Sequence, residues 1–383
     1  MSQKAPPRFS LDIYLLGCVL ILIGIGLAFL FSASYLKAEV SSSSPYFYVL
    51  KQLESLKFGL VALLLTYFIP TKFWFKASLF GLIIAVLLLY MALTETFGIK
   101  AMGAYRWVKI LDYRFQPSEF SKLALILFLA RFLARHGELT KGLSYGFLPS
   151  LIFMAFFGFL IILEKDLGGA IVLAILILGM NLVSELKIRY FVIFTVLLGI
   201  SFWVLVMSQE YRISRIDGWL DPFRDPQGAG YPILHSFYAF ARGGIFGVGP
   251  GASVEKQFYI PEVHTDYIFS VVGEELGLVG VIFVAGLFLF FTARGFMIAK
   301  AATKLSDYYL AIGATLIISI PAFINMGVTL SIWPAKGLPL PFFSYGGSNL
   351  FFNLAAVGFL LNIAANSTYE AGKLKEDGHG KHP

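Results

Sequence analysis

The sequence predicts an all-α integral membrane protein with ten transmembrane helices, both termini in the cytoplasm, and a large extracytoplasmic loop between the seventh and eighth helices. Two observations predict this fold class. The 383 residues are 58% hydrophobic and only 14% charged, which is too apolar for the surface of a soluble globule. Apolar segments of roughly 18 to 25 residues also recur, each long enough to cross about 30 Å of hydrocarbon as a helix.

The expected helices leave one long loop and several short connections. Their approximate ranges are 11–34, 53–70, 73–93, 117–134, 147–164, 167–183, 190–207, 266–293, 308–330 and 347–366. We therefore expect a single polytopic membrane domain over residues 1–366, with its extracytoplasmic loop at 208–265, and a disordered cytoplasmic tail at 367–383. The first segment lacks a small-residue cleavage site, so we expect it to be a retained helix.

Lysine and arginine set the expected orientation. If the N-terminus is cytoplasmic, the inner segments hold most of the basic residues, among them Lys4, Arg8 and Arg131, and the short outer loops hold far fewer. This bias accounts for the net charge of +7 without a nucleic-acid partner. The single cysteine, Cys18, excludes an internal disulfide.

Polar, Gly-rich and Pro-rich sequence gathers in three outer regions, 94–122, 208–265 and 331–348. Function carried by loops on a rigid scaffold is therefore expected on the outer face. In the first region, Glu119 and Lys122 stand at i, i+3 near the start of a helix and can pair. They form either a structural ion pair or a substrate-facing group.

Other charged residues of the outer regions leave two interpretations open. Arg106 and Trp107 suit either an interfacial anchor or a site for a lipid phosphate. Glu164 and Asp166 lie in a tight turn, "EKDLGGA", where turn chemistry and an N-cap compete with a substrate-facing role. The long loop is expected to be an interfacial lid or a partner-docking surface, and its aromatic residues are interspersed with Arg212, Arg215, Arg242 and Lys256.

Several classes of site have no matching motif. The sequence has no HExxH, no paired CxxC and no GxSxG, which argues against zinc catalysis and a serine hydrolase. The run "RGGIFGVGPG" is not in a strand–turn–helix context and does not indicate nucleotide binding. Carboxylate chemistry remains, and no metal ligands are predicted.

The stretch "HTDYIFSVVGEELG" places three acids at the outer end of the eighth helix. Asp266 stands at the mouth of the helix, where partial desolvation raises a carboxylate pKa toward the range of a general base. An N-cap is the alternative role. Glu274 and Glu275 lie roughly 12 Å deeper. They are either buried structural groups that bond to neighbouring cations or substrate-facing charges.

Four longer motifs together resemble the SEDS family of membrane proteins (shape, elongation, division and sporulation). They are "FQPSEFSKL", "RDPQGAGY", "GASVEKQFYIPEVHTDYIFSVVGEELG" and "KGLPLPFFSYGGSNL", and the resemblance runs from about Leu11 to Ala365. "SVEKQFYIPEVHTD" and the lysine of "PAKGLPLP" resemble division members more than elongation members. Tyr267 stands where the family usually has Phe, and "EKDLGG" lacks the usual Pro and Thr.

The resemblance implies a peptidoglycan glycosyltransferase that polymerises lipid II, the undecaprenyl-pyrophosphate-linked disaccharide pentapeptide, by an inverting displacement. It implies that Asp266, which follows the His–Thr pair, is the catalytic base, and that a class B penicillin-binding protein is the partner. A divalent cation, Mg²⁺ or Mn²⁺, is a further candidate for the pyrophosphate. The expected substrate-binding residues are Arg106, Trp107, Glu119, Lys122, Arg212, Arg215, Arg242, Lys256, His264, Thr265, Lys336, Ser344 and Tyr345.

The resemblance further implies a location in the bacterial cytoplasmic membrane, at the division septum, among membrane lipid and other division proteins. Three other functions are weighed beside division polymerase. A transporter that flips lipid II would use Glu119, Lys122, Glu274 and Glu275 as a polar path. A non-catalytic scaffold would only recruit a partner. The elongation polymerase would share the chemistry but serve the side wall.

Overall fold

The computed structural model describes residues 11–379 apart from 43, 102–103, 111–112, 185 and 258–259. The chain is mostly helical. The helices are α1 (Ile13–Ser42), α2 (Phe47–Phe68), α3 (Thr71–Leu93), α4 (Pro117–His136), the 3₁₀ turn η1 (Gly137–Lys141), the π turn η2 (Leu143–Phe147), α5 (Leu148–Leu163), α6 (Leu167–Val183), α7 (Ile188–Met207), α8 (Glu210–Leu220), α9 (Tyr231–Gly243), α10 (Ile268–Ala301), α11 (Leu305–Thr329) and α12 (Gly347–His379).

The helices α1 to α7 and α10 to α12 fall on the predicted segments. Within the described residues, seven helical segments are long and apolar enough to cross a membrane. They are Ile13–Val40, Thr71–Leu93, Leu143–Leu163, Ile188–Met207, Ile268–Ala301, Leu305–Thr329 and Gly347–Glu370. The helix α6 is apolar but shorter, and α2 and α4 carry charges within their length, such as Lys57 and Lys122. The protein is therefore a multi-pass membrane protein.

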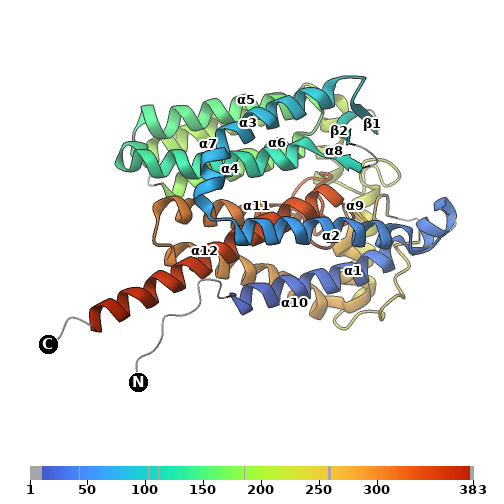
Figure 1. The fold of residues 1–383 in the computed structure, drawn as a ribbon. Helices are drawn as coiled ribbons and strands as arrows, with labels where there is room; N and C mark the ends of the chain where they lie inside the picture. The colour runs from blue at the N-terminus through green and yellow to red at the C-terminus, as the bar shows by residue number, and fades with distance from the viewer. Residues whose placement is uncertain are drawn as a thin grey trace.

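The long helices form a bundle whose two ends differ (Figure 1). The start of α1 and the end of α12 lie at one end, and β1, β2, α8 and α9 lie at the other. Within the bundle α12 packs along α2, α10 packs between α1 and α11, and α4 packs between α3 and α11. The irregular, polar segments that the sequence predicted to carry the function are therefore gathered at the end opposite the termini.

The expectation of an all-α chain is wrong for the first outer region. An antiparallel sheet of order β1-β2-β3 is formed there by β1 (Gly98–Ala101), β2 (Ala104–Ile110) and β3 (Tyr113–Phe115). In β2 the side chains of Ala104 and Val108 are buried, and β2 packs against α3 and α4. Lys100 of β1 pairs with Tyr105 and Ile99 pairs with Trp107, so Arg106 is the extra residue of an irregularity in β2, directly before Trp107.

The long loop is also more structured than predicted, since it holds α8 and α9. After α9 the chain runs down beside α10, which is broken at Gly277 (φ 66°, ψ −161°). The backbone N–H groups of Leu278 and Val279 donate to Gly244 and Ile245 at 2.9 and 3.2 Å, and Val248 donates back to the carbonyl of Glu274 at 3.0 Å. The loop thus covers the outer part of α10, whose residues from Ile268 to Glu275 are buried.

The last helix extends beyond the predicted tail boundary. α12 continues to His379, so residues 367–379, which were predicted to belong to a disordered tail, are helical. Residues 380–383 of that tail lie outside the described residues, as do Lys4 and Arg8 of the orientation argument.

Candidate active site

Asp266 sits in a tight turn directly before α10, half-buried at the end of the bundle opposite the termini. The backbone N–H groups of Thr265 and Asp266 both donate to the carbonyl of Glu262 at 3.0 Å. Glu262 has φ of 49°, a left-handed conformation that is uncommon for a non-glycine residue and is found most often at functional sites. The turn therefore fixes the direction in which the Asp266 carboxylate points.

A second loop, which follows α11, lies against this carboxylate. The side-chain amide of Asn325 on α11 donates to the carbonyls of Asp266 and Leu338 at 2.8 and 2.7 Å, and so ties the two loops together. A Cβ atom at Gly337 would lie 3.0 Å from Oδ2 of Asp266. Only glycine leaves the carboxylate its full room at this point.

Aromatic rings and an amide hold the remainder of the second loop. The rings of Tyr48 and His264 lie 4.7 Å apart, and those of Tyr48 and Tyr345 lie 5.1 Å apart. The N–H of Tyr345 donates to the carbonyl of His264 at 2.9 Å. Burial lowers the pKa of His264 to about 4, and the charge of Lys37 adds to the effect. His264 is therefore neutral at physiological pH, and its contacts indicate a packing role beside Asp266.

Ser344 and Thr265, two further residues predicted to bind substrate, are engaged in their own turns. The hydroxyl of Ser344 accepts from the N–H of Leu340 at 2.8 Å. The hydroxyl of Thr265 donates to the carbonyl of Glu262 at 3.0 Å. These contacts stabilise the loops that flank Asp266.

The environment of Asp266 keeps it protonatable near neutral pH. Burial raises the pKa of its carboxyl to about 6, helped by the charge of Glu262 and opposed by a hydrogen bond from Thr265 and by the cations Arg215 and Arg106. A carboxylate with this pKa is mostly ionised at pH 7 yet retains a useful proton affinity, as a general base requires.

Two cations of the long loop, Arg212 and Arg215, lie near Lys336 of the second loop. Burial lowers the pKa of Lys336 to about 8, and Arg212 and Arg215 lower it further while Asp166 opposes them. The ammonium of Lys336 lies 4.6 Å from the ring centroid of Phe202 on α7. Three cations, Arg212, Arg215 and Lys336, thus lie close enough to repel one another, which is the arrangement that an anionic ligand would stabilise.

Arg106 approaches from the sheet. Its guanidinium donates to the backbone carbonyl of Lys165 at 2.5 Å and, at 3.4 Å, to that of Glu164. In that turn Asp166 caps α6 by accepting from the N–H of Gly169 at 2.9 Å. Glu164 is fully buried, and burial, together with the charge of Asp166, raises its pKa to about 9 against the effect of Arg106. The side chain of Glu164 is therefore a neutral acid.

Glu119 and Lys122 are paired inside the bundle. The ammonium of Lys122 donates to Oε1 of Glu119 at 2.7 Å, both side chains being buried. Asn349 on α12 reaches Oε2 of Glu119 at 3.4 Å. This geometry fits a structural ion pair within α4, which Asn349 links to α12.

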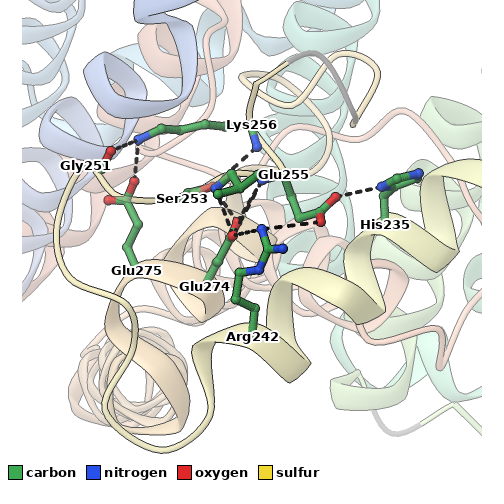
Figure 2. Close-up of polar contacts among 9 residues, drawn as sticks. His235, Arg242, Gly251, Ser253, Glu255, Lys256, Glu274 and Glu275 are labelled. Carbon is green, nitrogen blue, oxygen red and sulfur yellow. Dashed lines mark hydrogen bonds and ion pairs between the residues drawn. The ribbon is translucent and has the colours of Figure 1, made fainter.

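The deeper acids of α10 lie in a separate network (Figure 2). Glu274 is fully buried and accepts from the hydroxyl of Ser253 and from the N–H groups of Val254 and Glu255, at 2.9 and 3.2 Å for the two amides. The guanidinium of Arg242 lies 3.7 Å from Glu274. Figure 2 shows these groups converging from α9, the loop and α10.

Glu275 is held by a second set of contacts in the same network. The ammonium of Lys256 donates to Glu275 at 2.7 Å, to Ser32 of α1 at 2.8 Å and to the carbonyl of Gly251 at 2.7 Å. The side chain of Lys256 is 8% exposed. Lys256 and Arg242 were predicted to bind substrate, but their contacts attach the loop to α10. Neither cation is among the groups that set the pKa of Asp266.

Some residues that shape the site were not predicted from the sequence. Asn325, Gly337 and Glu262 hold or border Asp266, and no motif distinguishes an Asn within an apolar segment from one that faces lipid. The described residues contain no group of three or more His, Cys, Asp or Glu side chains that is placed to hold a metal ion. The divalent cation for the pyrophosphate stays a prediction.

Comparisons with known proteins agree with this architecture. The model of the FtsW/RodA/SpoVE family, described as "Cell cycle protein", matches residues 13–369. The probable peptidoglycan glycosyltransferase FtsW of Trichlorobacter lovleyi is 38% identical over 355 residues, which are 92% of this chain and 93% of that protein. The probable peptidoglycan glycosyltransferase FtsW of Coxiella burnetii is 36% identical, over 95% of this chain and 99% of that protein.

Solved structures match over nearly the whole length. One match is a chain from the structure described as "Structural coordination of polymerization and crosslinking by a peptidoglycan synthase complex". It superposes with a TM-score of 0.77 at 28% identity, covering 94% of this chain and 98% of that chain. The rod shape determining protein RodA of Thermus thermophilus superposes with a TM-score of 0.67 at 25% identity, covering 94% and 98%. The chain belongs to the FtsW/RodA/SpoVE family, the SEDS family that its motifs resemble.

Proposed function

We propose that this protein is a peptidoglycan glycosyltransferase of cell division, which polymerises lipid II at the outer face of the bacterial cytoplasmic membrane with Asp266 as its general base. The observation that carries this proposal is the Asp266 site. A half-buried carboxylate with a pKa of about 6 lies near two cations from distant parts of the chain, Arg106 on β2 and Arg215 on α8.

The proposed reaction is a single inverting displacement. The ionised carboxylate of Asp266 takes the proton of the acceptor's 4-hydroxyl as that oxygen forms a bond to the anomeric carbon of the donor. The bond from this carbon to the pyrophosphate oxygen breaks, and the electron pair leaves with undecaprenyl pyrophosphate. Fixed cations stabilise the charge that develops on this leaving group. Arg106, Arg215 and Lys336 have the required charge and location.

The position of Asp266 suits a substrate that is part lipid and part sugar. The lipid tail stays in the outer leaflet while the sugar remains in water, so the base must stand at the boundary between them. We propose that ten helices, α1 to α7 and α10 to α12, cross the membrane with both termini inside and the 208–265 segment outside. An impermeant thiol reagent applied from outside to a Cys18→Ala protein should not label a cysteine at position 138, whereas labelling there contradicts this topology.

The decisive test is Asp266→Asn in the purified protein with its penicillin-binding partner. The substitution keeps shape and hydrogen bonding but removes the proton-accepting lone pair, so lipid II polymerisation should fall by roughly 10² or more. Melting temperature and complex formation should stay near wild type. Glycan synthesis by Asp266→Asn at close to the wild-type rate would contradict the assignment of Asp266 as the base.

The relatives support a role in division over elongation, since those at 35–38% identity carry the FtsW name. We propose that a class B penicillin-binding protein is the partner, because one structural match belongs to a peptidoglycan synthase complex. Depletion in the source bacterium should give filaments, and rounded cells with normal septa would instead assign the protein to elongation.

The transporter alternative draws no specific support from the geometry. The charges that it would use as a polar path are held in local pairs, Glu119 with Lys122 and Glu275 with Lys256. Arg215 and Arg106 act instead on the carboxyl of Asp266.

A further inference from the structure

Buried polar atoms without a hydrogen-bond partner gather around Asp266. Within the described part of the chain they include Nδ1 of His264, the hydroxyl of Tyr267, Oδ1 of Asn325 and both carboxyl oxygens of Glu164. His264 and Tyr267 flank Asp266 in sequence, Asn325 bonds to its carbonyl, and Arg106 lies close enough to both Glu164 and Asp266 to shift their pKa values. A buried polar atom left unpaired costs free energy, so each of these atoms calls for a partner, such as a water or a ligand atom.

Tyr267 differs from the other residues in this cluster. The ring of His264 is packed by Tyr48, and Asn325 already uses its amide N–H groups on two carbonyls. Tyr267 is 7% exposed, its ring belongs to the hydrophobic core, and its hydroxyl has no partner among the described residues. The described residues therefore give the phenol oxygen no partner, whereas the ring is packed in the hydrophobic core.

The charges beside Tyr267 indicate what its hydroxyl can bind. Burial raises the pKa of Tyr267, Asp266 raises it further, and Arg215 lowers it. The phenol therefore stays protonated at every working pH and acts as a hydrogen-bond donor. Its two charged neighbours are the proposed base and a cation with an exposed side chain on α8. A ligand held by that cation presents anionic oxygens, which are the acceptors that a phenol donor fits.

We propose that the hydroxyl of Tyr267 donates a hydrogen bond to a phosphate oxygen of the donor's pyrophosphate, beside Arg215. This inference rests on the proposed function and names a further substrate-contacting residue of the same site. The alternative acceptor is the carboxylate of Asp266 itself, which would make Tyr267 a positioning residue for the base. The two differ in what a Tyr267→Phe protein loses, namely affinity for pyrophosphate or the pH midpoint of the reaction.

The test uses the full-length protein with its penicillin-binding partner and inorganic pyrophosphate as the probe. Pyrophosphate should raise the melting temperature of the wild type and inhibit its lipid II polymerisation. In Tyr267→Phe both effects should need roughly tenfold more pyrophosphate, since a hydrogen bond to a charged group is lost. The melting temperature without pyrophosphate should not fall, because the removed hydroxyl has no partner in the protein. Tyr67→Phe, which removes a hydroxyl from a buried tyrosine of α2, is the matched control and should respond as wild type does.

Two outcomes overturn the inference. One is an equal response of wild type and Tyr267→Phe to pyrophosphate, including no response in either. The other is an unchanged response with a shifted pH midpoint, which assigns the hydroxyl to Asp266. Because the melting experiment needs no turnover, it remains informative if Asp266→Asn polymerises normally. In that case the polymerase mechanism fails while the pyrophosphate contact of Tyr267 stands.

Discussion

The acids in and just before the first part of α10 form two groups that differ in how completely their charges are paired. One is the paired cluster of Glu274 and Glu275, and the other is Asp266 with the cations near it. Glu274 and Glu275, roughly 12 Å deeper than Asp266, accept from amides and hydroxyls and face Arg242 and Lys256 (Figure 2). Asp266 forms no ion pair among the described residues, and Arg215 and Arg106 only lower the pKa of its carboxyl. The acid that we propose as the base thus differs from Glu274 and Glu275 in how its charge is paired.

The largest effect is expected from breaking the paired cluster. Among the described residues, Lys256→Ala leaves the buried Glu275 with the Ser32 hydroxyl as its side-chain partner. Removing one partner of a buried ion pair costs about 3–5 kcal/mol. The melting temperature should fall steeply, and polymerisation should fall only as the folded fraction does. Lys141→Ala is the matched control, since Lys141 and Glu138 form a pair whose Glu138 side chain is 85% exposed, and such pairs contribute about 1 kcal/mol or less.

A rescue variant sharpens this prediction. Glu275→Gln combined with Lys256→Met removes both charges together, so much of the lost stability should return. If Lys256→Ala melts as wild type does but no longer makes glycan, Lys256 is a substrate ligand, as the sequence first suggested. The two clusters would then not differ in the way described above.

What the sequence could predict follows the range of the interactions involved. Helix positions depend on apolar runs, and these were placed correctly for α1 to α7 and α10 to α12. The sheet at 98–115 was missed because the alternation "AYRWVKI" is short and lies in a polar region that had been treated as loop. The break at Gly277 was missed because it depends on backbone bonds from the distant residues Gly244 and Ile245.

The candidate site shows the same limit. Asp266 was predicted because a local motif and its place at the helix mouth identify it. Arg242 and Lys256 were assigned to substrate because they share the long loop with Arg212 and Arg215, and only folding separates the two pairs of cations. Asn325 and Gly337 act on Asp266 through tertiary contacts that no spacing rule contains.

A smaller effect should separate the clusters by pH. If Asp266 is the base, it must be ionised, so polymerisation should fall as pH drops through about 6 and should approach a tenfold loss per unit well below that pH. The cation of Arg215 holds this pKa down. Arg215→Gln should therefore move the acid limb to higher pH, and Arg242→Gln, which alters the paired cluster, should leave its midpoint in place. Rate profiles from pH 5 to pH 8, taken for folded protein with its partner, measure both, and equal shifts in the two variants would contradict the separation.

The last prediction concerns Glu164, a buried acid apart from both Asp266 and the Glu274–Glu275 pair. Its pKa in the folded protein is about 9, raised first by burial, whereas an unfolded glutamate titrates near 4.3. Between these values the folded state binds a proton that the unfolded state has released, so the free energy of unfolding decreases as pH rises through this window. Glu164→Gln mimics the neutral acid, and it should leave the melting temperature near wild type at pH 5 and raise it relative to wild type by pH 8. Glu138→Gln, at an exposed site, should show no such divergence. Parallel melting curves for wild type and Glu164→Gln across this range would mean that Glu164 is ionised in the fold, and Arg106 would then be its partner as well as a neighbour of Asp266.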